Sequence, residues 1–249
     1  RALAGRRIKT DREDALNVAE LLAAGRLPTA WAPPSDISAL RDVTRHRHYI
    51  SRQHARVLHR VKAIMAQVNR PGPARLKAPG LMRYLKAQRD KLPAHLVDQL
   101  EMAVDELVLL ERQLERIDVR LKATLSSPRF RGQAHRLMSF PGVKWVLAGT
   151  ILAEVGDFHR FAHRDGLTRF AGLDPRVFSS ADTTRTGRIA KQGSRELRWA
   201  LVQAAWVAVR NDGPYRTRWL RIARRLLLAM RAAELSQSDY VAGGAKTAA

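Results

Sequence analysis

Residues 96–121 read LVDQLEMAVDELVLLERQLERIDVRL, and this stretch decides the architecture of the chain. Apolar residues recur in it at alternating steps of four and three residues, at Leu96, Leu100, Ala103, Leu107, Leu110, Leu114, Ile117 and Leu121. This is the a/d pattern of a heptad repeat, and it predicts a long helix with one narrow apolar seam. The partner of the seam is either the preceding helix, in an antiparallel hairpin, or another protomer.

The preceding segment, 36–69, predicts a second long helix. Its apolar residues recur at three- and four-residue steps between many arginines, and Pro71-Gly72-Pro73 ends it. Ser126-Ser127-Pro128 ends the seam helix and marks a domain boundary. We therefore expect a helical coiled-coil region over 36–127 that also makes the protein a homo-oligomer.

The N-terminal residues predict a short helix over 10–24. Thr10-Asp11-Arg12-Glu13 has capping-box spacing, and Gly25 stops the helix. Asp11 and Asp14 are three residues apart and so share a helix face, where two carboxylates can bind Mg²⁺. The alternative is that they are acidic residues of an ordinary first helical turn.

The charge of the chain points to a polyanionic partner. It has 45 Lys plus Arg against 23 Asp plus Glu, a formal net charge of +22. No stretch of 18 apolar residues exists and the basic residues are spread along the whole length, so nucleic acid is favoured over a membrane surface. Cysteine is absent and no signal peptide is visible, which fits a cytoplasmic protein. The chain starts at Arg1 without a Met, and we expect residues in front of it.

A compact C-terminal domain is predicted over 128–232, followed by a disordered tail over 233–249. Gly142, Val143 and Lys144 lie in a Pro-Gly turn before an apolar helix, which has the form of a helix-hairpin-helix. In that motif the helix N-terminus binds a phosphate through backbone N–H groups. The alternative is a tight turn between packed helices. Gly156 is expected to cap the second helix, with Glu154 solvent-facing or capping.

Hydroxyl and cationic side chains are concentrated between residues 170 and 198. The cluster consists of Ser179, Ser180, Thr183, Thr184, Arg185, Arg188, Lys191, Arg195 and Arg198. A serine hydroxyl there could attack phosphorus while the cations hold the developing charge. The same composition fits a solvated basic loop that grips phosphates. His159 and His163 have metal-ligand spacing without a third ligand, so we expect an exposed or phosphate-contacting pair.

Several motifs in order resemble one family, the DEDD transposases of the insertion-sequence family one-ten, which are bridge-RNA-guided recombinases. Residues 9–15 resemble its last acidic motif, and the likeness continues over roughly residues 9 to 212. The C-terminal blocks that carry it are Phe140-Pro141-Gly142-Val143, Leu152-Ala153-Glu154-Val155-Gly156-Asp157, Phe170-Ala171-Gly172-Leu173-Asp174-Pro175, Thr186-Gly187-Arg188-Ile189, Lys191-Gln192-Gly193-Ser194 and Leu197-Arg198-Trp199-Ala200-Leu201.

The resemblance implies a fold and an activity. Residues 1–35 would be the C-terminal end of an RNase H-like domain, in which Asp11 and Asp14 match the third and fourth Mg²⁺-binding acidic positions. Ser180 matches the nucleophilic serine, with Ser179 as second choice. The chain would cut and rejoin duplex DNA with a structured guide RNA, and Gly142, Val143, Lys144, Arg185, Arg188, Lys191, Arg195 and Arg198 would contact nucleic acid.

Three departures from the family pattern leave an alternative open. The first two acidic positions would lie before Arg1, the usual Ser-Gly pair reads Ser180-Ala181, and the final helix is only loosely recognisable in Ile222 to Met230. A non-catalytic nucleic-acid-binding protein, either a transposase relic or a helix-hairpin-helix factor, is therefore the rival interpretation. In both cases the fold is expected to be mainly α, with long coiled-coil helices and a compact helical C-terminal domain.

Overall fold

The computed structural model describes residues 11–26, 30–69, 71–73, 76–180, 183–211 and 219–240. Among the strand residues, the description of 176–180, 183–186 and 188 covers the backbone. The chain divides into two compact units, residues 1–34 and residues 35–249. In the first unit, helix α1 spans Asp11–Ala23, as the capping pattern predicts, and Gly25 follows it with a φ of +63°. Thr10 lies outside the described residues.

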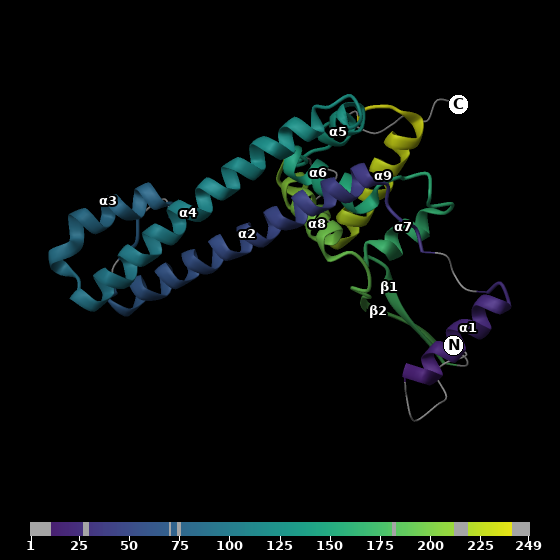
Figure 1. The fold of residues 1–249 in the computed structure, drawn as a ribbon, viewed down its shortest axis with the longest axis horizontal. Helices are drawn as coiled ribbons and strands as arrows, with labels where there is room; N and C mark the ends of the chain where they lie inside the picture. Colours follow the sequence, from purple (N-terminus) through teal and green to yellow (C-terminus); the bar gives the residue numbers. More distant parts are fainter. Residues whose placement is uncertain are drawn as a thin grey trace. The chain divides into compact units, whose positions relative to one another are not determined.

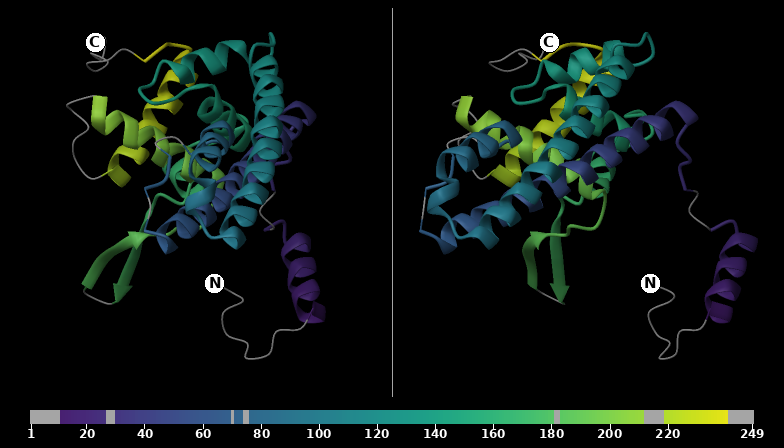
Figure 2. Two further views of the ribbon diagram at one scale, coloured as in Figure 1. Left: turned by 90° about the vertical axis from the view of Figure 1, so that its left-hand side faces the viewer. Right: turned by 60° about the vertical axis from the view of Figure 1, so that its left-hand side comes forward.

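The second unit is built on a hairpin of two long helices (Figures 1 and 2). Helix α2 spans Ser35–Gln67 and helix α4 spans Ala94–Leu125. Their antiparallel order is fixed by three side-chain pairs, in which the α4 number falls as the α2 number rises: Arg47–Asp118, His54–Glu111 and Arg60–Glu106. The predicted seam therefore faces the antiparallel partner within the chain, where its residues are buried or half-buried.

The outer end of this helical hairpin has its own apolar core. Helix α3, Ala78–Gln88, and the short 3₁₀ turn η1, Arg89–Lys91, connect α2 to α4, and α3 packs on α4. Leu81 of α3 packs there with Val61 and Leu100, and all three side chains are fully buried. The sequence pattern did not predict α3, because only a short amphipathic stretch between prolines signals it.

Helix α6, Trp145–Val155, consists mostly of buried residues, and the remaining helices complete the second unit. They are α5, Arg131–Met138; α7, Arg164–Phe170; α8, Arg195–Asn211; and α9, Trp219–Ser236. Helix α6 contacts α5 and α8, and it also contacts α2 and α4 of the helical hairpin. At Gly149 of α6, an added Cβ would lie 3.0 Å from a methyl group of Leu121, so this glycine allows the close approach of α4.

Two strands form an antiparallel β-hairpin between α7 and α8. Strand β1 spans Pro175–Ser180 and strand β2 spans Thr183–Ile189. Ser180 pairs with Thr183 and Ser179 pairs with Thr184, and a bulge separates Pro175 from Val177. We call residues 175–189 the serine hairpin.

The main fold prediction, a mainly helical protein, is confirmed. Three details differ. The segment predicted as a basic loop contains the serine hairpin. The predicted regions 36–127 and 128–232 lie in one compact unit, because the first half of α2 packs on α6. Residues 233–240 belong to the fold rather than to a tail, since Glu234 is 4% exposed and the ring of Tyr240 stacks on Phe140. Residues 241–249 lie outside the described ranges.

Candidate functional site

The serine hairpin is fixed at its base by backbone hydrogen bonds between the segments that enter and leave it. The amide of Ala190 donates to the carbonyl of Asp174 over 2.7 Å, and the amide of Lys191 donates to Gly172 over 3.2 Å. The amide of Ser194 donates to the carbonyl of Phe170 over 2.8 Å. The ladder therefore continues irregularly beyond the strands, and it ties the hairpin to the end of α7 and the start of α8.

Two glycines make this close approach possible. Gly193 has a φ of +142°, and an added Cβ would lie 2.3 Å from the Phe170 carbonyl oxygen. Gly172 has a φ of +65°, and an added Cβ would lie 2.4 Å from the guanidinium of Arg198. These two positions of the Gly-Leu-Asp and Gln-Gly-Ser blocks are needed for backbone geometry, and they carry no chemistry of their own.

Three of the predicted phosphate-contacting cations lie at this base. Lys191 and Arg195 are exposed, and Arg198 is half-buried and donates from Nη1 to the carbonyl of Ala171 over 3.2 Å. Arg185 and Arg188 are residues of β2, and Arg185 pairs with Phe178 in the register. The structure thus brings the predicted serine and five predicted cations onto one hairpin and its base.

A buried carboxylate, that of Glu154, contacts the base of the serine hairpin. Glu154, at the end of α6, is 2% exposed, and its two oxygens accept bonds of 2.9 and 3.1 Å from the guanidinium of Arg45. The hydroxyl of Ser194 donates to Glu154 Oε2 over 2.9 Å. The hydrogen bond that Arg45 donates to Glu154 raises the pKa of Arg45. The expectation that Glu154 faces solvent is therefore wrong, because α2 and the start of α8 cover it.

A signal in the sequence could have revealed Glu154. It is the only charged residue of the eleven in α6, WVLAGTILAEV, whose other residues are mostly apolar. A single acid at the end of such a helix indicates a buried carboxylate with a cationic partner. Ser194 and Arg45 carry no comparable signal, since a serine before a helix reads as an ordinary cap and Arg45 is one arginine among many.

The predicted helix-hairpin-helix turn packs against the middle of α8, whereas the base of the serine hairpin lies at the start of α8. Helices α5 and α6 are joined by residues 139–144 and pack together, and Gly156 caps α6 with a φ of +71°. At Gly142, φ is +80° and an added Cβ would lie 2.6 Å from Val207 of α8. The side chain of Val143 is buried, and its amide donates to the Phe140 carbonyl over 3.1 Å, whereas Lys144 is exposed.

The two predicted phosphate-contacting groups are therefore separated. Val207 lies nine residues beyond Arg198 on α8, which corresponds to about 13 Å along the helix axis. Phosphate contact by Gly142, Val143 and Lys144 stays a prediction. The structure adds a second reason for the glycine, because the turn packs tightly against α8.

The carboxylates of the predicted metal site lie in the first turn of α1. Asp11 is exposed, and Asp14 is half-exposed and takes part in an interaction of its own. Their spacing allows both to reach one cation, so they fit two of the ligands that Mg²⁺ requires. Within the described ranges, no three His, Asp or Glu side chains gather as a metal site.

The histidine residues play local roles. His159 is exposed, and both its amide and its ring contact Asp157, at 2.8 and 3.0 Å. His48 is buried in α2, where its ring lies 3.2 Å from the hydroxyl of Thr150 and edge-on to Trp199. Burial, reinforced by the charge of Arg47, lowers the pKa of His48, so the imidazole is neutral near pH 7.

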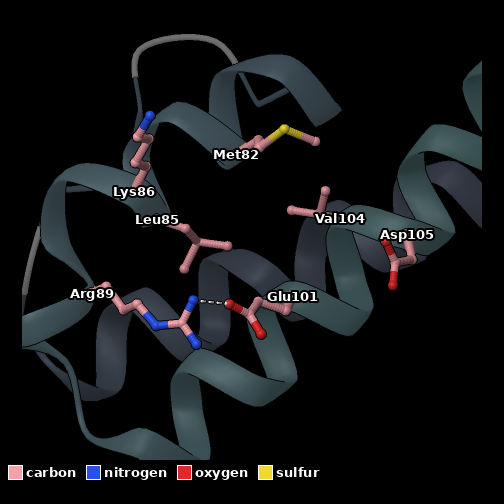
Figure 3. A pocket seen from close by; sticks show the side chains of 7 residues that line it. All are labelled: Met82, Leu85, Lys86, Arg89, Glu101, Val104 and Asp105. Atoms are coloured by element: carbon pink, nitrogen blue, oxygen red, sulfur yellow. Dashed lines mark ion pairs between the residues drawn. The ribbon is translucent and has the colours of Figure 1, made fainter.

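A groove of about 450 Å³ lies between α3 and α4 at the outer end of the helical hairpin (Figure 3). Met82, Leu85 and Val104 form its apolar part, and an ion pair of 2.8 Å between Arg89 and Glu101 crosses one side. It contains none of the predicted site residues. Among the described residues, no helix combines the length and the apolar character that a membrane span requires.

Two protein-family models match parts of the chain. Residues 134–220, which include the serine hairpin and its base, match the model of the Transposase IS116/IS110/IS902 family. Residues 1–70 match the DEDD transposase model of IS110 elements, which is described as a transposase. The chain belongs to the IS110/IS116 family of transposases. The resemblance drawn from the motifs is thereby confirmed at the level of the transposase family, and the relatives that match are named as transposases.

Three relatives illustrate the extent of the match. A Sinorhizobium fredii protein named as a transposase, y4qE, is 32% identical over 205 residues, 81% of this chain and 48% of that protein. A Pseudomonas aeruginosa protein named as a family 20 transposase is 26% identical over 226 residues, 86% of this chain and 65% of that protein. The transposase for insertion sequence element IS1111A of Coxiella burnetii is 35% identical over 89 residues, 34% of this chain and 24% of that protein. The chain thus spans about half to two thirds of the length of the first two.

Proposed function

We propose that this transposase-family chain cuts and rejoins DNA strands through a covalent ester with Ser180. The observation that carries the proposal is the position of Ser180, at the end of β1 in a hairpin whose second strand and base contain five cationic residues. A serine in a segment with several arginine and lysine residues suits an attack on a phosphodiester, because such cations can stabilise the charge of the phosphorane-like transition state.

The step exchanges one ester bond for another. The Ser180 oxygen forms a bond to phosphorus, the bond from phosphorus to one deoxyribose oxygen breaks, and that oxygen takes up a proton while a base accepts the serine proton. The phosphoserine ester conserves the bond energy of the cut strand. A deoxyribose hydroxyl of another DNA end can then displace the serine, so rejoining requires no external energy source.

The divalent cation of the DEDD family would be bound partly by Asp11 and Asp14, together with two further acidic positions. Bound Mg²⁺ supplies Lewis-acid polarisation of a phosphoryl oxygen and lowers the pKa of a coordinated hydroxyl. Within this chain, the role of the two carboxylates is to orient that ion. The three-residue spacing on α1 supports this role.

The direct test of the proposal is a protein–DNA adduct that resists denaturation. A form of the protein that carries all four acidic positions is incubated with guide RNA, Mg²⁺ and labelled DNA. We expect a labelled band at the mass of the protein plus one DNA strand. Absence of the adduct, together with intact DNA binding, would instead favour the non-catalytic nucleic-acid-binding protein that the basic composition also fits.

Nucleic-acid binding itself is expected to depend strongly on salt. If the basic surface makes about six to ten phosphate contacts, the affinity for duplex DNA and for structured RNA falls by about three to five orders of magnitude between about 50 and 200 mM salt. A titration of fluorescently labelled duplex, followed by anisotropy at several salt concentrations, measures the slope. A flat titration would contradict the proposed phosphate contacts.

The 249-residue chain alone is expected to bind Mg²⁺ weakly. Two carboxylates leave the ion with most of its water ligands, so calorimetry should give an affinity in the millimolar range. Asp11→Asn with Asp14→Asn should remove even this signal. Tight stoichiometric binding by the chain, or weak binding that survives the double substitution, would show that other residues are the ligands.

Homo-oligomerisation and guide-RNA binding remain predictions. The seam that suggested self-association is used within the chain, since Leu100 and Leu107 are fully buried against the helical hairpin. A homo-oligomer would therefore use a surface other than the residues of this seam that are buried within the chain, and α4 itself has exposed apolar residues at Met102, Leu109 and Val119.

A further inference from the structure

Glu154 is a buried carboxylate to which the proposed chemistry assigns no role. It accepts two hydrogen bonds from Arg45 of α2 and one from Ser194, while Arg41 donates to the carbonyl of Ala153 over 3.0 Å next to it. A carboxylate with 2% exposure is costly unless several donors satisfy it. Its partners come from two elements far apart in sequence, so the contact joins the helical hairpin to the start of α8.

Ser194 links Glu154 to the base of the serine hairpin through its hydrogen bonds. Its hydroxyl donates to Glu154 and accepts from the amide of Leu197 over 3.1 Å, which makes it the N-cap of α8. Its own amide bonds to Phe170, on the other side of the hairpin base. A single residue therefore connects the buried carboxylate, the first turn of α8 and the segment that leads into β1.

The serine hairpin depends on this base for its orientation. In the described part of the chain, β1 and β2 pack extensively only against each other. Two strands without a third strand or a covering helix are marginally stable on their own. The position of Ser180, five strand residues beyond Pro175, is therefore set by the segments 170–174 and 190–194.

We propose that Glu154 is a positioning residue, whose buried carboxylate holds Ser194 and Arg45 together and so orients the hairpin that carries Ser180. The inference rests on the proposed role of Ser180 as the nucleophile. A nucleophile that is displaced by about 1 Å can lose about a hundredfold in rate, although it still contacts its substrate. Loss of the carboxylate would act in this way, without touching DNA or the reacting atoms.

The test compares two buried glutamates. Glu154→Gln keeps the size of the side chain but places an amide NH₂ against the donors of Arg45 and Ser194. Glu234→Gln is the matched control, because Glu234 is 4% exposed and bonds to Arg136 over 3.0 Å but lies between α5 and α9, away from the hairpin base. Both variants lose a buried ion pair, and only the first loses a contact to Ser194.

The first readout is hydrogen exchange of backbone amides in the 249-residue chain. Glu154→Gln should speed exchange over residues 176–189 by about tenfold or more relative to α4, and Glu234→Gln should leave these amides unchanged. Ser194→Ala should also speed exchange over residues 176–189. Ser194→Thr retains the hydroxyl and the cap, so its exchange rates should equal those of the unsubstituted protein. If Glu154→Gln fails to fold, the two Ser194 variants test the inference by themselves. Unchanged exchange in the hairpin of the folded Glu154→Gln or Ser194→Ala variant would overturn the inference.

The second readout is the rate of adduct formation in the form with all four acidic positions. Glu154→Gln should slow it by about a hundredfold, with DNA affinity within a few-fold, while Glu234→Gln slows it no more than its folded fraction requires. Equal losses in both variants would mean that Glu154 acts only on stability, and would overturn the inference. Failure of the proposed function is seen separately, either as absence of the adduct in the unsubstituted protein or as an adduct that persists in Ser180→Ala, and it leaves the exchange result unaffected.

Discussion

Ser180→Ala is expected to abolish the covalent protein–DNA adduct and to leave DNA binding within a few-fold. The loss should be complete because alanine has no oxygen to attack phosphorus, and an alcohol at another position reacts at neutral pH only where a base and an electrostatic environment activate it. Binding should change little because one lost hydroxyl contact costs about 1 kcal/mol, roughly a fivefold change in affinity. Denaturing electrophoresis of labelled DNA measures the first effect and anisotropy measures the second.

Ser179→Ala is the matched control. Ser179 and Ser180 are consecutive residues of β1, opposite Thr184 and Thr183. Consecutive positions in a strand belong to opposite faces of the ribbon, so only one of the two serines can present its hydroxyl to a given phosphate. If Ser179→Ala removes the adduct and Ser180→Ala keeps it, the nucleophile is Ser179. If both variants form the adduct, neither serine is the nucleophile and the hairpin grips phosphates only.

Leu107→Asp is expected to destabilise the second unit by about 3–5 kcal/mol. Leu107 is fully buried in the core shared by α2, α3 and α4, so the substitution removes apolar contacts and buries a charge without a partner. A typical domain has a free energy of unfolding of only about 5–15 kcal/mol, so a large part of the stability would be lost. Urea unfolding followed by circular dichroism gives the value.

Leu109→Asp separates this effect from a general change in helix propensity. Leu109 lies two residues further along α4 and is 54% exposed, so the same substitution should change stability by no more than about 0.5 kcal/mol. Equal unfolding midpoints for the two variants would show that the seam is not the buried face of α4.

The long helices could be predicted from the sequence because their signal is repetitive. The seam of α4 has an apolar residue in every half-heptad, and 36–69 has a similar period, so the observed bounds differ from the predicted ones by only a few residues. The partner of the seam could not be predicted, because an antiparallel hairpin and a dimer bury the same residues. The antiparallel pairing with α2 shows in ion pairs such as Arg47–Asp118. Such pairs depend on the register of two segments that are distant in the sequence.

The sequence predicts the candidate site at the level of residue type rather than of architecture. The serine and the cations between residues 179 and 198 are candidates because their composition is unusual, and the family motifs cover the same positions. The strands were missed because this hairpin shows no regular apolar alternation along Ser179-Ser180 or Thr183-Thr184, which is the signal of a half-buried strand. Glu154 was misassigned because its burial comes from α2, more than a hundred residues earlier in the chain.

The geometry at Gly193 affects how substitution data on this protein should be read. Any side chain at position 193 would overlap the Phe170 carbonyl oxygen, and the backbone has a φ that L-residues rarely adopt. A mutational scan scored by transposition would therefore mark position 193 as intolerant of every replacement, just as it would mark a nucleophile. The two kinds of position can be told apart by chemistry, since an alanine that only removes a reactive group leaves a folded protein, whereas alanine at 193 changes the path of the chain.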